Sequence, residues 1–288
     1  MDYYISSNCL TVTISSAGAE LQSIKSSDGT EYLWNGDEKY WKKHAPNLFP
    51  YIGRFTSGKY TYKVKEYQMP RHGFIIGTEM SVSQSSDTSI TFSYADCEQT
   101  HAMYPFKFNY SVKYDLCDDE LSISYIVDNT DDKTIYFGVG GHPAFNVPLE
   151  KGKSFEDYYI KFEDGAAPIL IRLSASGLVD GEESYRLFDN RIYLRHGLFD
   201  YDAIIFKNSG HGVRLCSRGK KSISVSYPDM PYVGFWHMPK TDAPFLCVEP
   251  WSSLPSREGI VEDLETQPSL VHLEPSKHYE NTWTIKIS

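Results

Sequence analysis

Histidines in three short stretches are the first residues of this sequence that could do chemistry. His142 lies in GVGGHPAFNVP, residues 138–148, between two glycines and a proline. The tripeptide Arg-His-Gly occurs twice and contains His72 and His196. Imidazole gives and takes protons near neutral pH, so each histidine is a candidate general acid or base. A single histidine is more often a hydrogen-bonded loop or core residue, so a second observation has to choose among them.

The backbone around His142 is expected to bend. Gly140 and Gly141 can adopt conformations that side chains forbid, and they let other groups approach closely. Pro143 restricts the backbone on the other side of the histidine. We therefore expect a bulge or sharp bend that holds the imidazole rigidly.

Familiar catalytic and nucleotide-binding motifs do not account for these stretches. The segment 53–60, GRFTSGKY, resembles a phosphate-binding loop, but Tyr60 stands where the motif needs serine or threonine and no helix pattern follows. GVGGHP resembles a dinucleotide fingerprint, but Pro143 takes the last glycine position and the strand-turn-helix context is missing. The sequence has no G-x-S-x-G and no H-E-x-x-H motif, so esterase and zinc-protease chemistry have no local support.

Charge and cysteine usage exclude several classes of partner. The net charge of -10, from 38 acidic and 28 basic residues, argues against nucleic acid and anionic membranes as partners. No stretch approaches the ~20 apolar residues of a membrane helix, and the first residues lack a secretion signal, so we expect a cytoplasmic protein. The 5 cysteines are scattered without a C-x-x-C pair, which argues against a disulfide framework and against a zinc site.

The elements that must position these residues are strands. Apolar and polar residues alternate with a period of two in five segments: 11–15, 89–94, 120–127, 222–227 and 282–288. This pattern predicts antiparallel sheet with one solvated face. Asp28-Gly29 and Asp180-Gly181 predict turns, and the segment 36–44, GDEKYWKKH, is the only helical candidate.

No linker, charge block or internal repeat divides the chain, so residues 1–288 are expected to form a single domain. Many short strands in one uninterrupted chain predict an all-β fold with very little helix. The expected architecture is a large antiparallel β-sandwich of two sheets packed face to face.

Four stretches, taken in order, resemble the aldose 1-epimerase (galactose mutarotase) family, and in detail its shorter bacterial members. They are NLFPYIGRF at 47–55, PRHGFIIG at 70–77, GVGGHPAFNVP at 138–148 and FLCVEPWSSLP at 245–255. The closing HYENTWTIKI is similar to the last strand of that family, so the resemblance spans nearly the whole chain. It implies a β-sandwich whose cleft binds a pyranose, and an isomerase that needs neither a cofactor nor a metal.

The resemblance also implies roles for particular residues. Glu249 matches the catalytic carboxylate of the family, and His142 matches its second active-site histidine. Arg54 matches the substrate-positioning arginine and His72 the first active-site histidine. Arg54 and His72 would donate hydrogen bonds to sugar oxygens; their ordinary alternatives are a surface ion pair and a loop histidine.

An aspartate that holds sugar hydroxyls is expected between His142 and Glu249. FDYDAIIF offers Asp202, with Asp200 as the second candidate. Trp236 could stack on the apolar face of a sugar, although a large aromatic residue in a strand is more often part of the core. The assignment of His72 leaves His196 a structural role.

The chemistry of anomer exchange fits the two predicted catalytic residues. Opening a pyranose requires a base for the proton of the C1 hydroxyl and an acid for the ring oxygen. Glu249 lies among apolar residues, and burial there would raise its pKa toward neutrality and make it a usable base. His142 would act as the acid. Their ordinary alternatives are an ion pair at a strand end and a hydrogen-bonded bend residue.

Three functions remain open at this stage. The first is an aldose 1-epimerase that acts on a free hexose such as galactose or glucose. The second is a hexose-6-phosphate 1-epimerase, which needs a cationic site for the phosphate; the candidate donors are Lys43, Arg71, Lys240 and Arg257. The third is a non-catalytic sugar-binding protein of the same fold. The expected partner is a small-molecule sugar, and a homodimer is compatible with the sequence.

Overall fold

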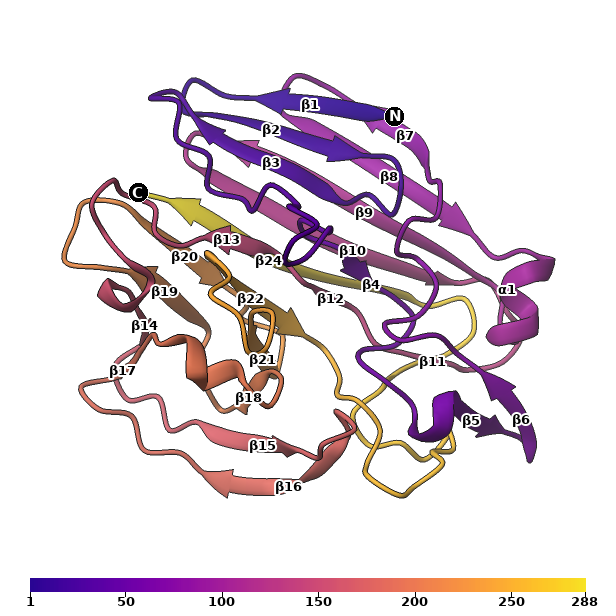
Figure 1. Ribbon diagram of the computed structural model, residues 1–288. Helices are drawn as coiled ribbons and strands as arrows, with labels where there is room; N and C mark the ends of the chain where they lie inside the picture. Colours follow the sequence, from indigo (N-terminus) through magenta and orange to yellow (C-terminus); the bar gives the residue numbers. More distant parts are fainter.

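Two large antiparallel sheets face each other in the computed structural model, which describes the backbone of residues 1–288 and all side chains except those of residues 83–85 (Figure 1). One sheet has nine strands, in the order β17-β14-β19-β20-β24-β10-β9-β8-β7. Their bounds in chain order are β7 Ser81–Ser85, β8 Ser89–Ala95, β9 Phe108–Cys117, β10 Glu120–Asn129, β14 Tyr159–Phe162, β17 Arg191–Tyr193, β19 Gly212–Cys216, β20 Ser222–Ser226 and β24 His278–Ile287.

The other large sheet has eight strands, in the order β16-β15-β18-β21-β22-β12-β4, with β13 also paired to β22. Their bounds are β4 Asn47–Leu48, β12 Gly140–Gly141, β13 Ala144–Asn146, β15 Ile169–Leu173, β16 Val179–Ser184, β18 Ile204–Lys207, β21 Tyr232–Trp236 and β22 Phe245–Trp251.

Three small sheets complete the fold: β1 Asp2–Ser6 with β2 Leu10–Ser15 and β3 Leu21–Ser26, β5 Lys59–Tyr62 with β6 Lys65–Gln68, and β11 Ile135–Phe137 with β23 Val271–Leu273.

Helix is scarce. In the backbone that the structure describes, the only α-helix is α1, Glu98–Met103, and three short 3-10 turns lie at Thr56–Gly58, Phe155–Asp157 and His196–Phe199. Nowhere in residues 1–288 is there a helix with the length and apolar character required to cross a membrane.

Alternating side chains build the core between the two large sheets. In β9, Phe108, Tyr110, Val112, Tyr114 and Leu116 are buried, while the residues between them are half-buried or exposed. The neighbouring strands β10 and β24 alternate in the same way. Burial of one strand face contributes about 25 cal/mol for each Å² of apolar surface removed from water. The period of two in the sequence therefore identifies the face that packs.

Direct contacts join the two sheets where β4 and β12 meet the nine-stranded sheet. The hydroxyl group of Tyr125 in β10 donates a hydrogen bond to Oδ1 of Asn47 in β4, at 2.9 Å. A Cβ atom added to Gly141 would lie 2.5 Å from the Trp283 indole of β24. The glycine in β12 therefore allows a close approach of the two sheets.

The predicted fold class is confirmed, and each of the five predicted strand segments lies in or largely overlaps a strand, namely β2, β8, β10, β20 and β24. The turn at Asp28-Gly29 is confirmed as well, because the Gly29 amide donates to the Ser26 carbonyl at 2.9 Å.

Three local predictions are wrong. Residues 36–44 form a single turn and then an extended segment, because the amides of Tyr40 and Trp41 both donate to the Asp37 carbonyl and no further helical turn follows. Asp180-Gly181 lies within β16, at a register shift against β15, and Gly181 has a positive φ of 101°. This arrangement is a β-bulge rather than a turn.

Gly140 and Gly141 form strand β12 and not a bend. Neither residue has a positive φ, and both pair in register with β4. Glycine is needed for space: a Cβ atom on Gly140 would lie 2.6 Å from the Trp251 side chain. The two glycines therefore mark a structural requirement, but the requirement is close packing and not a bend.

We expect Gly141→Ala to lower the free energy of unfolding by about 1–3 kcal/mol, because the added methyl group overlaps Trp283. Urea denaturation measures the change. Gly197→Ala is the matched control, because a Cβ atom there meets only an Asp200 carboxylate oxygen, at 3.7 Å, and φ is not positive. Equal stability of the two variants would contradict the packing explanation.

Candidate active site

Loops from distant parts of the chain form one cleft over the eight-stranded sheet, with a volume of about 700 Å³. This volume lies within the range of about 300–1,000 Å³ that small-molecule sites occupy. A second, much smaller cavity shares part of this lining, and we call it the floor of the cleft. Five residues line both the cleft and its floor: Arg54, His72, His142, Asp202 and Trp236. Glu249 lines the floor alone, so the structure brings all six predicted site residues together.

Glu249 lies in β22, whose seven residues are all buried. Glu249 itself is only 1% exposed. Its neighbour on β21 is Gly234, and a Cβ atom on that glycine would lie 3.2 Å from the Trp251 indole. Oε2 of Glu249 lies 3.3 Å from Nε2 of His142. The carboxyl group is therefore held at the bottom of the cleft with the imidazole as its polar neighbour.

The segment after β12 fixes His142 against β22. The His142 amide donates to the Pro46 carbonyl at 3.0 Å, and the Val248 amide donates to the Pro143 carbonyl at 3.1 Å. The backbone on both sides of the imidazole is therefore tied to a neighbouring segment. Among the described side chains, neither Nδ1 of His142 nor Oε2 of Glu249 has a hydrogen-bond partner, which is unusual for buried polar atoms.

Burial shifts the two pKa values in opposite directions. It raises the pKa of Glu249 well above its ordinary value, an effect that the Arg71 guanidinium partly offsets. Burial, followed by the positive charge of Arg71, lowers the pKa of His142 to about 3. Burial therefore disfavours charge on both residues of the pair.

Two N–H donors compete for the His72 ring. The Gly53 amide lies 3.1 Å from Nδ1, and Nε of Arg71 lies 3.0 Å from Nε2. A neutral imidazole has a single acceptor nitrogen, so it satisfies one of these donors at a time. Burial and the Arg71 charge lower the pKa of His72 well below its ordinary value, which keeps the ring neutral.

The two candidate aspartates differ in depth. Asp202 lines both the cleft and its floor, whereas Asp200 lines only the outer cleft. Asp202 has a positive φ of 110° and its Oδ1 accepts the Ala203 amide at 2.9 Å. His196 does not line the cleft; its Nδ1 lies 3.2 Å from Nε2 of the buried His237.

Aromatic side chains form one wall of the cleft. Trp236 is 8% exposed and forms a T-shaped pair with His142, with ring centroids 5.6 Å apart. It belongs both to the cleft wall and to a small apolar cluster that includes Phe245. Trp41 also lines the cleft, and sequence reasoning missed it because residues 36–44 read as a helix. The signal available was a tryptophan in an otherwise charged segment.

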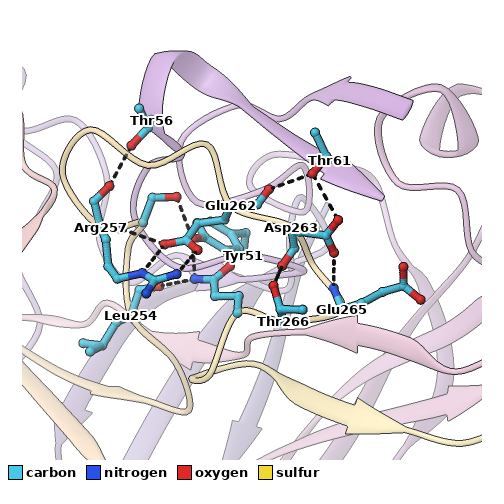
Figure 2. Close-up of polar contacts among 11 residues, drawn as sticks. Tyr51, Thr56, Thr61, Leu254, Arg257, Glu262, Asp263, Glu265 and Thr266 are labelled. Atoms are coloured by element: carbon cyan, nitrogen blue, oxygen red, sulfur yellow. Dashed lines mark hydrogen bonds and ion pairs between the residues drawn. The ribbon is translucent and has the colours of Figure 1, made fainter. Parts of the chain in front are cut away.

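A polar cluster outside the cleft positions the Arg54 segment. The Arg257 side chain donates two hydrogen bonds to Glu262, at 3.0 and 2.8 Å, and its carbonyl accepts the Thr56 hydroxyl (Figure 2). Next to this cluster, the Ser256 amide donates to the Arg54 carbonyl at 3.0 Å. Arg257 is thus committed to Glu262 and does not line the cleft, so it is not a phosphate donor for this site.

One group of potential metal ligands occurs among the described side chains. Ligand atoms of His142, Cys247 and Glu249 lie within 4.8 Å of one another, and all three residues are buried. Burial, and then the nearby carboxyl group of Glu249, raise the pKa of the Cys247 thiol well above its ordinary value. A metal ion at this group would therefore have to displace the thiol proton, because the thiolate is the ligand form.

The fold and cleft define this chain as a galactose mutarotase-like β-sandwich. It superimposes on a galactose mutarotase related enzyme of Lactobacillus acidophilus with a TM-score of 0.96, at 36% identity, over 100% of this chain and 97% of the other. A galactose mutarotase-like protein of Lactobacillus casei gives a TM-score of 0.94 at 31% identity, with 100% of both chains covered.

Sequence comparisons agree with the structural ones. The aldose 1-epimerase family profile matches residues 1–266. The plasmid and chromosomal forms of protein LacX of Lactococcus lactis subsp. lactis are 32% and 31% identical to this chain, each with 96% of both chains covered. The chain belongs to the aldose 1-epimerase family, a family of sugar isomerases.

Burial of Glu249 predicts a pH-dependent stability difference. The folded state holds the Glu249 proton above the ordinary pKa, so the free energy of unfolding falls as pH rises from about 4.5 toward the folded-state pKa. Glu249→Gln has no proton to lose. We expect the melting temperature of this variant to exceed that of the wild type by an amount that grows between pH 5 and pH 8.

Differential scanning calorimetry measures this difference. Glu183→Gln, at an exposed position of β16, is the control and should show a constant offset from the wild type. A constant offset for Glu249→Gln as well would mean that the carboxyl group ionises as freely as a surface one.

Proposed function

We propose that this protein is an aldose 1-epimerase that interconverts the α and β anomers of a hexose, with Glu249 and His142 as the acid–base pair. The observation that carries the proposal is their 3.3 Å contact at the floor of a sugar-sized cleft, with no other hydrogen-bond partner for Glu249 Oε2 among the described residues. Buried polar atoms without partners are costly to a fold, and a reacting group is a physical reason to keep them.

Ring opening needs only proton transfers. The C1 hydroxyl loses its proton to the base, its oxygen forms the aldehyde C=O, the C1–O5 bond breaks, and O5 takes a proton from the acid. Rotation about the C1–C2 bond turns the aldehyde over, and the reverse transfers close the ring as the other anomer. The pair holds one proton before and after each step, so the cycle consumes nothing.

The proton balance matches the state of the pair. Burial opposes charge on both residues, so the proposed cycle starts with the proton on Glu249. Its transfer to His142 across the 3.3 Å contact gives the carboxylate and imidazolium without exchange with solvent. Glu249 then acts as base toward the C1 hydroxyl and His142 as acid toward O5, and the two residues exchange roles in ring closure.

The other predicted residues would orient the sugar. Arg54 would donate hydrogen bonds to sugar oxygens, and the Asp202 carboxylate would accept hydrogen bonds from hydroxyl groups. Both ring nitrogens of His72 face the N–H donors of Gly53 and Arg71, so we assign His72 to the cleft lining rather than to donation toward the sugar. Their support is that all of them line the cleft and its floor. Trp236 would pack against the apolar face of the pyranose.

Anomer exchange by NMR tests the proposal. Magnetisation transfer between the α and β signals of galactose and glucose gives the exchange rate with and without protein. We expect the wild type to accelerate exchange, and Glu249→Gln and His142→Asn each to reduce kcat by about 10²-fold or more, because each removes a proton-transfer group.

Two matched substitutions serve as controls for these variants. Glu183→Gln and His196→Asn change the same residue types outside the cleft and should retain the wild-type rate. Full activity of Glu249→Gln would refute the assignment. A wild type that binds these sugars and accelerates no exchange would identify a non-catalytic sugar-binding protein.

A hexose 6-phosphate is a second candidate substrate, because four cationic side chains line the cleft of an acidic protein. Lys43, Arg54, Arg71 and Lys240 face two carboxylates, those of Asp200 and Asp202. The positive excess contrasts with the net charge of -10 for the chain. Three of these cations are the phosphate donors proposed from the sequence.

Glucose 6-phosphate and galactose 6-phosphate in the same NMR assay decide between the two substrates. If the phosphate binds, Lys240→Gln should raise KM for the phosphorylated sugar by about tenfold and leave KM for the free hexose unchanged, because a charge-assisted hydrogen bond contributes about 1.5–3 kcal/mol. Lys151→Gln, exposed and outside the cleft, is the control. Equal changes in KM for both sugars would exclude a phosphate contact at Lys240.

A further inference from the structure

Trp41 covers one face of the His142 imidazole. The two rings are stacked, with centroids 4.9 Å apart and planes 28° from parallel. Trp236 and His72 each form a T-shaped pair with the same imidazole, with centroids 5.6 Å apart. Glu249 contacts Nε2 of the same ring. Trp41 is the ring that stacks on the imidazole face.

Hydrogen bonds from several segments hold Trp41 in place. Its carbonyl accepts the Trp34 indole N–H at 2.8 Å, and its amide donates to the Asp37 carbonyl at 3.0 Å. The adjacent Tyr40 hydroxyl donates to Oδ1 of Asp242 at 2.7 Å, which ties residues 36–44 to the loop after β21. The indole itself is half-buried and reaches the cleft.

Two properties of His142 depend on such a cover. Nδ1 has no hydrogen-bond partner among the described residues, so packing, rather than a second hydrogen bond, has to fix the orientation of the ring. Water must also be kept from the ring if the proton is to stay within the Glu249–His142 pair. A flat indole against the imidazole does both, because it restricts ring rotation and occupies the space that water would take.

We propose that Trp41 is a positioning residue for the reaction of the Glu249–His142 pair: its indole holds the imidazole toward Glu249 and keeps water from the imidazole face. The catalytic part of this inference rests on the proposed function. The part that concerns water and ring orientation does not, because it can be measured in the protein without a sugar.

The charged and titratable groups that face His142 determine the sign of the expected change. Glu249 contacts Nε2, the Arg71 guanidinium disfavours a second positive charge, and His72 is neutral. None of these groups is altered when Trp41 is replaced. Water at the exposed imidazole face would stabilise the charged form, so the pKa of His142 should rise toward its ordinary value.

NMR titration of the imidazole signals measures this change without any activity assay. We expect the pKa of His142 to rise in Trp41→Ala by about one unit or more, a tenfold change in proton affinity. Trp41→Phe keeps an aromatic cover and should titrate as the wild type does. Tyr201→Ala is the matched control, because Tyr201 lines the same cleft and is 92% exposed.

Kinetics test the catalytic part of the proposal. At pH 7 we expect kcat for anomer exchange to fall about tenfold or more in Trp41→Ala and to recover largely in Trp41→Phe. An unchanged His142 pKa in a folded Trp41→Ala variant overturns the inference, as does an unchanged kcat. A wild type without exchange activity refutes the proposed function instead, and the titration still decides whether Trp41 shields His142.

Discussion

The contact between Glu249 and His142 is the constraint on which the rest of the structure depends. A carboxyl group and an imidazole, 3.3 Å apart, are buried together in the middle of a large sheet. Burying either group in charged form is costly, and burial shifts both pKa values toward the neutral forms. This arrangement requires that both faces of β22 be covered and that no competing acceptor reach the carboxyl group, so the sandwich on one side and the cleft loops on the other are both needed.

Glycines make the required approach possible. Gly234 leaves room for the Trp251 indole beside Glu249, and Gly140 and Gly141 let β12 lie against the Trp251 and Trp283 indoles. His142 follows β12 directly, so the packing of the two glycines sets the position of the imidazole. Larger side chains would separate the strands, and the imidazole would then lose contact with the carboxyl group. The fold and the candidate site are therefore specified by the same few positions.

The sequence predicts the strands better than the loops, for a physical reason. In β9 or β10 the period of two reports directly which face is buried, and the register follows from that face. Residues 36–44 carry a helix-like mixture of charges, yet Trp41 packs against His142, which lies far away in the chain. Such a long-range contact cannot be read from the local pattern. The same limit applies to the site: no local pattern relates residue 54 to residue 249, and the resemblance to a family supplied that relation.

Arg71 shows how the cleft balances opposing demands. Its positive charge lowers the pKa of Glu249, which favours a carboxylate base, and also lowers the pKa of His142, which opposes an imidazolium acid. Arg71 therefore lowers both pKa values, whereas burial moves the two pKa values in opposite directions. Burial is the largest cause of both pKa shifts: it outweighs the Arg71 charge at Glu249 and acts together with that charge at His142. Apolar packing around the pair is therefore the main influence on its ionisation.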